Sequence, residues 1–368
     1  MPDCPNVSPP ALPWAVDPRR TPMPQVKNKI QRILVVKPSS LGDIVHVFPA
    51  LELLRQKFPD AELDFLVHPA FADILDFSPF PVAHKILFDR KHLSKLTTFA
   101  PKFLHLVREL RQRRYDLIID FQGLIRSAIF AKIAKGCPVI GFAHPREALA
   151  TLGYNLKFNV PAGHAVERNV NLVNAFLSSH DAVPKLNLPQ DRENIAKLQT
   201  LIDPMPEELI ALLPGSRWPS KCFPPRLFAD VIGKIHAQQP QCVFVIVGAK
   251  SDSSVAKTIC EIAGSGIPLL DLSGKTSLGV MAELLRKARV VISNDSGPMH
   301  VAAALQKPVF GFFGPTDPDK TGPFGGFHHI YRNPVKCLGC LKRNCPLSVV
   351  ECHKLDSTQI ANDVTQTL

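Results

Sequence analysis

The chain has 368 residues, of which 45% are hydrophobic and 20% are charged, a composition that excludes a disordered protein. Its length favours two domains, and no stretch approaches the run of about 18 apolar residues that a membrane-spanning helix needs. The formal net charge of +11 predicts a polyanionic partner, which could be nucleic acid, an anionic membrane face or a phosphorylated substrate.

The N-terminal segment is rich in proline, and we predict that residues 1–28 form a disordered arm. The segment lacks the continuous apolar run of about 7 to 15 residues that a secretory signal peptide requires, so we expect a cytoplasmic protein. The nine cysteines are an odd number, and several lie in apolar contexts, so no disulfide framework is expected.

The folded part is predicted to begin with a strand over residues 33–36 that is buried on both faces. A polar loop over 38–43 and a helix to about Lys57 follow, and Pro49 inside this helix predicts a kink or a restart. Two more strands and a helix complete the elements expected in the first half: 63–67, 117–120 and the segment containing Ile125, Ile129 and Ile133.

The second half repeats this alternation of apolar strands and helices. The expected elements are strands over 209–213, 243–248, 290–293 and, as the last strand, 309–313, with helices over 227–238 and 300–305. Such an alternation implies parallel sheets covered on both faces, and the stretch 181–206 has the composition of a connection between domains. We therefore predict an α/β protein with two Rossmann-like domains, over 29–182 and 183–368, and a cleft between them.

Each conspicuous polar loop directly follows an apolar strand. The loops are Ser39 to Asp43, Gln122–Gly123, Ser216–Arg217 and Asp295 to Gly297. Ligands of open α/β sheets bind at the carboxyl ends of strands, so these loops predict a site in the cleft. The sequence contains no G-x-G-x-x-G after a strand, no complete P-loop and no H-E-x-x-H, which disfavours a dinucleotide-dependent oxidoreductase.

The segment Asp295–His300 has the chemistry of an anion site. Ser296 can cap the following helix, Gly297 allows a ligand to approach the backbone, and the free N–H groups favour negative charge. Asp295 could accept hydrogen bonds from sugar hydroxyls. A well-capped helix with a buried histidine is an equally good interpretation of this segment alone.

Two further loops carry charged groups suited to catalysis. Ser216, Arg217 and Lys221 supply a hydroxyl and two cations after a strand, as a phosphate clamp needs, although a solvated surface loop has the same composition. Asp43 stands at the start of a helix, where an aspartate is usually a cap. Its alternative role is a general base facing the cleft, and the helix dipole should then depress its pKa.

The segment 84–114 is strongly basic. Nine lysines and arginines stand there against Asp89 and Glu109, and interleaved leucines and phenylalanines predict amphipathic helices with a basic face. Such a face fits an anionic lipid surface, or it is simply a solvated helix face. Nucleic acid is not expected, because the aromatic residues look like packing residues rather than an exposed stacking platform.

Four clustered cysteines near the C-terminus have a spacing dense enough for a tetrahedral metal site. They are Cys337, Cys340, Cys345 and Cys352. Thiolate ligands suit zinc or iron, so we predict a structural metal here and no catalytic one. The alternative is four reduced thiols in an ordered tail.

Three segments resemble the motifs of glycosyltransferase family 9, the bacterial ADP-heptose:lipopolysaccharide heptosyltransferases. They are Lys37–Leu51, Leu213–Lys221 and Asp295–Pro318, and the resemblance extends from about Ile33 to the C-terminus. The segments 120–128 and 146–150, with 164–168 downstream, are most similar to heptosyltransferase I, which adds the first heptose to the Kdo sugar of Kdo-lipid A. The cysteine spacing is more typical of heptosyltransferase II and of heptosyltransferases that modify proteins.

The resemblance implies a GT-B fold and an inverting transfer from ADP-L-glycero-D-manno-heptose to Kdo-lipid A that needs no catalytic metal. It implies Asp43 as the catalytic base, and one base suffices for inversion. The implied donor-binding residues are Ser216, Arg217, Lys221, Asp295, Ser296, Gly297, Pro298, Met299 and His300. The implied acceptor-binding residues are Ser39, Ser40, Gly42, Gln122, Arg126 and Arg146.

The positive net charge suits an acceptor that carries carboxylates and phosphates, so we expect the enzyme to be peripheral on the cytoplasmic face of the inner membrane. Alternative acceptors are an inner-core heptose or a protein. A hypothesis of a different class is a non-catalytic anion-binding module that docks on the inner membrane, although such a module needs no base at Asp43.

Overall fold

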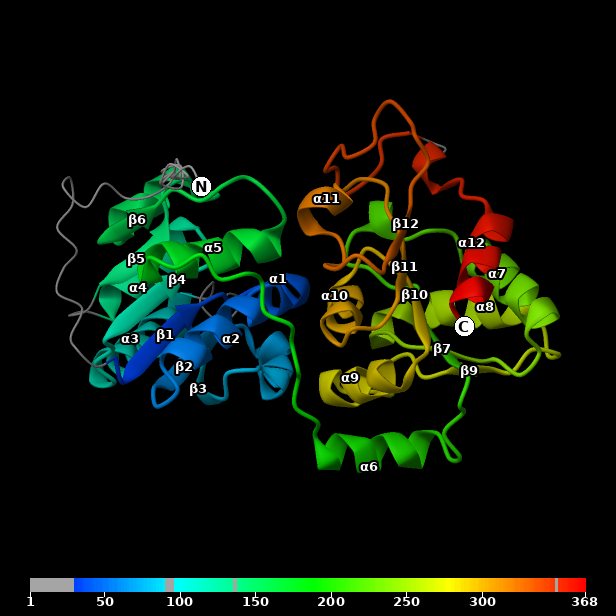
Figure 1. The fold of residues 1–368 in the computed structure, drawn as a ribbon, viewed down its shortest axis with the longest axis horizontal. Coiled ribbons are helices and arrows are strands. Elements are labelled where there is room, and N and C mark those ends of the chain that lie inside the picture. Colours follow the sequence, from blue (N-terminus) through cyan, green and yellow to red (C-terminus); the bar gives the residue numbers. More distant parts are fainter. Residues whose placement is uncertain (1–29, 90–95, 135–137, 348–349) are drawn as a thin grey trace, which may run out of the picture.

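The computed structural model describes residues 30–89, 96–134, 138–347 and 350–368, so the predicted arm over 1–28 lies outside the described residues. Two α/β domains lie side by side, each built on a six-stranded parallel sheet with helices on its faces (Figure 1). The predicted α/β fold class with two Rossmann-like domains is confirmed.

The N-terminal sheet has the strand order β3-β2-β1-β4-β5-β6. Its strands are β1 (Arg32–Val36), β2 (Glu62–Val67), β3 (Val82–Leu87), β4 (Leu117–Asp120), β5 (Val139–Phe142) and β6 (Leu156–Phe158). Helices cover it: α1 (Leu41–Val45), α2 (Phe48–Lys57), η1 (Pro69–Phe77), α3 (Leu96–Gln112), α4 (Ile125–Ile133), η2 (Ala148–Gly153) and α5 (Ala165–Leu177). The central strands β1 and β4 are buried on both faces, which explains their unbroken apolar sequences.

Two segments of this domain test the sequence-based expectations: the helix that contains Pro49 and the start of the basic segment. The helix predicted to reach Lys57 stops and restarts as α1 and α2, and Pro49 lies in the first turn of α2, where its missing N–H costs no hydrogen bond. The prediction of helix for the start of the basic segment was wrong, because residues 82–87 pair with β2 as an edge strand and Ile86 is buried beneath. Arg90, Lys91 and Lys95 lie outside the described residues.

The C-terminal sheet has the order β12-β11-β10-β7-β8-β9. Its strands are β7 (Leu209–Leu213), β8 (Val243–Ile246), β9 (Leu269–Asp271), β10 (Val290–Asn294), β11 (Val309–Phe312) and β12 (His329–Tyr331). Its helices are η3 (Pro219–Lys221), α7 (Pro225–Gln238), η4 (Lys250–Asp252), α8 (Ser253–Ala263), α9 (Leu278–Lys287), α10 (Gly297–Ala304), α11 (Pro318–Thr321), η5 (Glu351–His353) and α12 (Ser357–Thr367). The strand over 309–313 is not the last one, since β12 follows it, and three residues are too few to reveal a strand by periodicity.

The connection predicted over 181–206 contains a helix, α6 (Arg192–Leu201), which begins with Asp191 as its N-cap. The Asp191 N–H donates to Glu283 of α9 at 2.9 Å, and the Arg286 side chain donates to the Pro189 carbonyl at 2.7 Å. At the other end, the Asn174 amide of α5 donates to the Asp181 carbonyl at 2.8 Å. The connection is therefore tied to both domains, and the boundary predicted at 182/183 falls between these ties.

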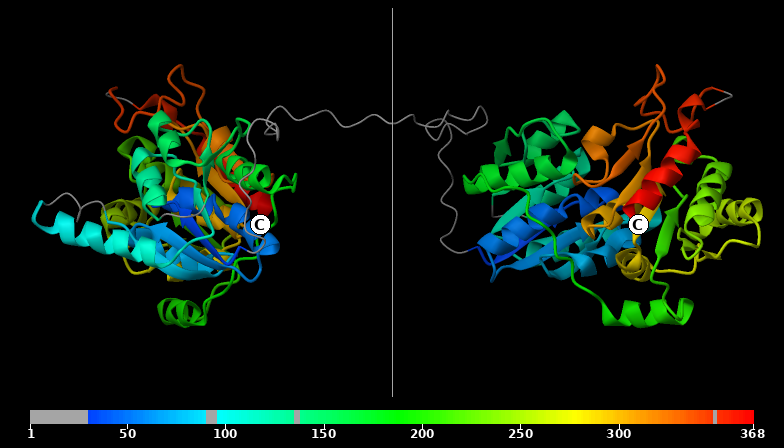
Figure 2. Two further views of the ribbon diagram at one scale, coloured as in Figure 1. Left: turned by 90° about the vertical axis from the view of Figure 1, so that its left-hand side faces the viewer. Right: turned by 45° about the vertical axis from the view of Figure 1, so that its right-hand side comes forward.

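The two domains share one hydrophobic core cluster. Leu41 and Ile44 of α1 belong to it together with the fully buried Met299 of α10, so α1 and α10 pack against each other. The left view of Figure 2 shows α3, in cyan, projecting from the N-terminal domain. No helix within the described ranges is long and apolar enough to cross a membrane.

Candidate active site

In the N-terminal domain the loops after β1 and β4 meet, because these strands are neighbours in the sheet. The Ser39 N–H donates to the Gln122 side-chain oxygen at 3.4 Å. The buried Lys37 ammonium donates to the Phe121 carbonyl at 3.0 Å, a second hydrogen bond that joins the two loops. The sequence-predicted residues Ser39, Ser40 and Gln122 therefore belong to one polar surface at the carboxyl end of the sheet, whereas Gly42 is buried in the contact between the domains.

Asp43 is held within its own turn. The Ser40 N–H and the Ser40 hydroxyl both donate to Asp43 Oδ2, at 2.8 and 2.6 Å. Burial acts to raise the pKa of Asp43, but the Lys37 ammonium and the Ser40 hydrogen bonds outweigh it and hold this pKa well below its usual range. The carboxylate is therefore ionised at neutral pH. Both hydrogen bonds use Oδ2, and none among the described residues uses Oδ1.

The loop after β4 is fixed by a buried carboxylate. Asp120 accepts hydrogen bonds from the Gln122 and Gly123 N–H groups at 2.8 and 3.2 Å, and from the Tyr154 hydroxyl at 2.8 Å. Complete burial raises the pKa of Asp120, and these hydrogen bonds oppose the rise. Gly123 has φ +67°, a conformation that favours glycine, and a Cβ there would lie 3.1 Å from Pro145 Cβ.

The two arginines predicted for the acceptor lie beside this loop. Arg126 is exposed in the first turn of α4, and Arg146 is exposed in the loop that packs on Gly123. The Glu147 N–H donates to the Gly123 carbonyl at 3.0 Å. Both guanidinium groups are therefore free to face solvent on the side of the domain where Gln122 lies.

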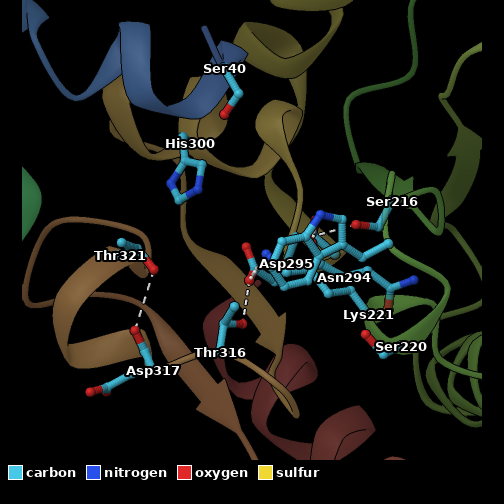
Figure 3. Close-up of polar contacts among 12 residues, drawn as sticks. Ser40, Ser216, Ser220, Lys221, Asn294, Asp295, His300, Thr316, Asp317 and Thr321 are labelled. Carbon is cyan, nitrogen blue, oxygen red and sulfur yellow. Dashed lines mark hydrogen bonds and ion pairs between the residues drawn. The ribbon is translucent and has the colours of Figure 1, made fainter. Parts of the chain in front are cut away.

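In the C-terminal domain the loops after β7, β10 and β11 converge on Asp295 (Figure 3). The Lys221 ammonium lies 2.6 Å from Asp295 Oδ2, and the Thr316 hydroxyl donates to the same oxygen at 2.5 Å. The Ser216 hydroxyl donates to the Asp295 carbonyl at 3.0 Å. The ring of Trp218 lies 4.8 Å from the Lys221 ammonium, in cation–π contact. Sequence reasoning missed Thr316 and Trp218 as site residues, although both follow strands.

The start of α10 differs from the prediction in its cap. Ser296 is the N-cap residue, but its side chain makes no cap hydrogen bond, so the expected capping by Ser296 was wrong. Its hydroxyl is buried and lacks a partner among the described residues. Pro298 occupies the first turn, and the Met299 side chain is fully buried, so Met299 can offer a ligand only its backbone.

Arg217 stands apart from this cluster. Its side chain is exposed, and its guanidinium lies over the ring of Phe71 in η1 of the N-terminal domain, 5.8 Å from the ring centre. The predicted pairing of Arg217 with Lys221 as two cations of one clamp is therefore not seen in this arrangement. Instead, Arg217 joins the two domains.

The two halves of the site meet through glycines and histidines. A Cβ on Gly42 would overlap the ring of His300, and one on Gly297 would come within 2.8 Å of Leu41 Cβ. His46 Nε2 lies 3.0 Å from His300 Nδ1. Figure 3 shows Ser40 and His300 on facing elements above the Asp295 cluster. The carboxylate turn of the first domain and the cationic cluster of the second therefore face the same interdomain space.

Three histidines lie buried along this contact. Burial lowers the pKa of His300 to about 3, and burial together with the neighbouring His300 lowers the pKa of His46 well below its usual value. Burial also lowers the pKa of His164, whose ring lies 5.2 Å from that of His46. These rings are neutral at neutral pH, and no pattern in the amino-acid sequence indicates that His46 and His164 adjoin His300.

The four C-terminal cysteines are free thiols. Burial raises the pKa of the Cys352 thiol, and the thiols of Cys337, Cys345 and Cys340 raise it further, so the four lie in one neighbourhood. Across the part of the chain that the structure describes, however, no group of three or more histidine, cysteine, aspartate or glutamate side chains is arranged to hold a metal ion. The predicted structural metal is thus without geometric support.

Comparison with known proteins gives concordant results. Residues 103–350 match the family model for glycosyltransferase family 9 (heptosyltransferase). Lipopolysaccharide heptosyltransferase 1 of Pseudomonas aeruginosa is 31% identical over 328 residues, covering 87% of this chain and 89% of the relative, and that of Escherichia coli K12 is 30% identical, covering 83% and 95%.

Solved structures agree. The E. coli heptosyltransferase WaaC with ADP superposes with a TM-score of 0.74 at 26% identity, covering 92% of this chain and all of that one. The same enzyme with ADP-2-deoxy-2-fluoro heptose gives a TM-score of 0.70 at 27% identity, covering 91% and 98%. The chain is a glycosyltransferase, and it belongs to glycosyltransferase family 9, the heptosyltransferases.

Proposed function

We propose that this enzyme transfers L-glycero-D-manno-heptose from ADP-heptose to the Kdo sugar of Kdo-lipid A in the synthesis of the lipopolysaccharide inner core. The observation that carries the proposal is the approach of Gly42 to His300, which sets the Asp43 turn opposite the Lys221–Asp295 cluster. The relatives named lipopolysaccharide heptosyltransferase 1 support heptose transfer to lipopolysaccharide, and Kdo-lipid A is the acceptor that the resemblance to heptosyltransferase I implies.

Asp43 is the general base in this proposal. Its Oδ1 takes the proton from the acceptor hydroxyl as that oxygen attacks the anomeric carbon of the heptose. Ser40 and Lys37 keep the carboxylate ionised, and a weak base suffices when the proton leaves late in the reaction. A single carboxylate acting as base, with no carboxylate nucleophile, gives inversion at the anomeric carbon.

The C-terminal cluster stabilises the leaving group. Negative charge develops on the departing ADP, and Lys221 with the backbone N–H groups of the first turn of α10 would receive it. Ser216 and the unpartnered Ser296 hydroxyl can donate to the donor phosphates. Asp295, oriented by Thr316, can accept from heptose hydroxyls. No step in this scheme requires a metal ion.

The acceptor side lies in the N-terminal domain. Gln122 with Ser39 and Ser40 would line the acceptor sugar, and Arg126 and Arg146 would pair with its carboxylates and phosphates. A lipid-linked acceptor implies work at the cytoplasmic face of the inner membrane. The net charge of +11 suits such an anionic surface.

The test is product formation from purified enzyme. ADP release and product mass are measured with ADP-heptose and Kdo-lipid A, and again with an acceptor that already carries the first heptose. We expect ADP release and a mass gain of one heptose with Kdo-lipid A. Transfer to the heptosylated acceptor alone would show that the acceptor sugar is an inner-core heptose and not Kdo. No ADP release with either acceptor would overturn the proposed function.

For the cysteine segment, we propose that a metal ion, zinc or iron, draws the four thiols together. The spacing of Cys337, Cys340, Cys345 and Cys352 in the sequence supports this, because four thiolates spaced so densely can supply the ligands of a tetrahedral site. Elemental analysis of protein purified without chelators should give one metal per chain, and the Cys337→Ser/Cys340→Ser variant should lose it. Metal-free wild-type protein with unchanged stability would reject the proposal.

A further inference from the structure

The N-terminal domain has an apolar surface that the proposed chemistry does not use. It consists of the outer sides of α3, α4 and η2, which we call the α3–α4–η2 face. Five of its large apolar side chains are exposed: Leu104 63%, Ile125 38%, Ile129 47%, Leu149 63% and Leu152 71%. The outward stripe of a helix in water is normally polar, and clustered exposed apolar residues mark interaction surfaces.

Direct contacts join the three elements into one surface. A Cβ on Gly153 of η2 would lie 2.8 Å from Ala128 Cβ of α4, so these helices touch. The Ile125 N–H donates to the Glu147 carboxylate at 2.8 Å. The ring of Phe103 in α3 lies 6.4 Å from that of Phe130 in α4. In Figure 1 α3 and α4 lie at the end of the N-terminal domain remote from the second domain.

Cations surround the apolar residues of this face. The exposed ones are Arg108, Arg111, Arg126, Lys132 and Arg146. The acidic residues of α3, α4 and the segment 144–153 are Glu109, which is half-buried, and Glu147, which caps the start of α4. The face is therefore both apolar and cationic. A second copy of the same face would be repelled, whereas an anionic surface would be attracted.

The face is continuous with the acceptor side of the active site. The loop at Gln122 and Gly123 leads directly into α4, and Gly123 packs on the backbone of Arg146. A sugar held at Gln122 therefore lies at one border of the α3–α4–η2 face. A lipid could keep its acyl chains in a bilayer against this face while its sugars reach the site.

We propose that the α3–α4–η2 face docks on an anionic phospholipid bilayer. Leu104, Ile129 and Leu152 enter the headgroup region, and the surrounding arginines and Lys132 contact lipid phosphates. The inference rests on the proposed function, because a lipid-linked acceptor gives the docking its purpose. It adds the surface that makes the contact and the orientation of the enzyme on the membrane.

Vesicle sedimentation of the full chain tests the apolar part. Wild-type protein should bind vesicles of phosphatidylethanolamine and phosphatidylglycerol and should not bind phosphatidylcholine vesicles. The Ile129→Ser/Leu152→Ser variant should lose about tenfold or more of its affinity, because each buried CH₂ contributes to partitioning. The matched control is Ile262→Ser on α8, since Ile262 and Ile129 are both 47% exposed. Equal losses in both variants would overturn the proposal.

Charge and oligomeric state give two independent checks. Arg108→Glu with Lys132→Glu should weaken binding and its dependence on salt, whereas Arg226→Glu on α7 should not. If sedimentation equilibrium instead shows a dimer that Ile129→Ser/Leu152→Ser dissociates, the face joins two copies and the membrane assignment is wrong.

Activity separates this inference from the proposed function. The Ile129→Ser/Leu152→Ser variant should transfer heptose to a soluble, deacylated Kdo acceptor at the wild-type rate and be slowed on acceptor embedded in vesicles. If wild-type protein transfers heptose to the soluble acceptor but does not bind vesicles, the docking proposal is wrong and the proposed function stands. Failure of wild-type transfer to both acceptors would remove the function itself.

Discussion

Asp43 and Asp295 are the two carboxylates to which the proposed mechanism gives a role, and they are held in different ways. The hydrogen bonds to Asp43 come from Ser40, three residues earlier in the same turn. The partners of Asp295 are Lys221 and Thr316, which come from the loops after two other strands. One carboxylate is positioned by local sequence and the other by the assembled sheet. The position of the Asp43 carboxylate should therefore tolerate changes elsewhere in the fold, and that of the Asp295 carboxylate should not.

The largest effect expected is on turnover when the local carboxylate loses its charge. Asp43→Asn keeps the shape of the side chain and its turn but cannot take a proton, so kcat should fall by about 10²- to 10⁴-fold. ADP affinity, measured by calorimetry, should not change, because the donor site lies in the other domain. Unchanged kcat would exclude Asp43 as the base.

Removing the long-range partner should affect binding and rate together. Lys221→Ala takes away the cation facing the departing ADP and leaves Asp295 with Thr316 alone. We expect kcat to fall by about 10²- to 10³-fold and the KM for ADP-heptose to rise. Steady-state kinetics and donor titration measure both. Near wild-type constants would leave the leaving-group role unsupported.

The contact between the two halves can be broken directly. Gly42→Ala would drive a methyl group into the His300 ring and push the domains apart, and a displacement of about 1 Å costs on the order of 10²-fold in rate. Gly233→Ala on α7 is the control, since a Cβ there meets no described atom within 4 Å. If both variants keep wild-type kcat and melting temperature, the close approach has no catalytic meaning.

Acid should weaken the interface where the buried histidines meet. Unfolded histidine titrates near 6.5, whereas the folded pKa values of His46, His164 and His300 are lowered, the last to about 3. The unfolded chain therefore binds more protons below pH 6.5, and stability falls as pH drops from 6.5 towards 3. Other groups acting on these rings are Asp43 and Glu167, which favour their protonation, and Lys37, Lys221 and His328, which oppose it.

We expect the melting temperature to fall by about 2 °C or more between pH 7 and pH 5. The lowered pKa of Asp43 contributes only below about 3.8, so it does not affect this interval. His46→Gln should flatten the dependence, and His180→Gln, at an exposed position, should not. Equal slopes for the two variants would remove the buried histidines as the cause.

Sequence reasoning recovered what depends on local pattern. Apolar strands followed by polar turns predicted both sheets, the restart at Pro49, and the turn that holds Asp43. It could not recover contacts made only when distant strands assemble, such as Thr316 on Asp295 or His46 on His300. It also missed short edge strands such as β12, which carry too few residues for a periodic signal.

The ties along the interdomain connection limit how the enzyme can open. The chain is anchored to the first domain up to Asp181 and to the second from Pro189 onwards. Any rotation between the domains must therefore be taken up by the dihedral angles of residues 182–188, where Pro184 fixes one of them. Val183 and Leu186 line a pocket with His46 and His300. Bending of this segment would thus change the shape of the pocket beside His46 and His300, where the two domains meet.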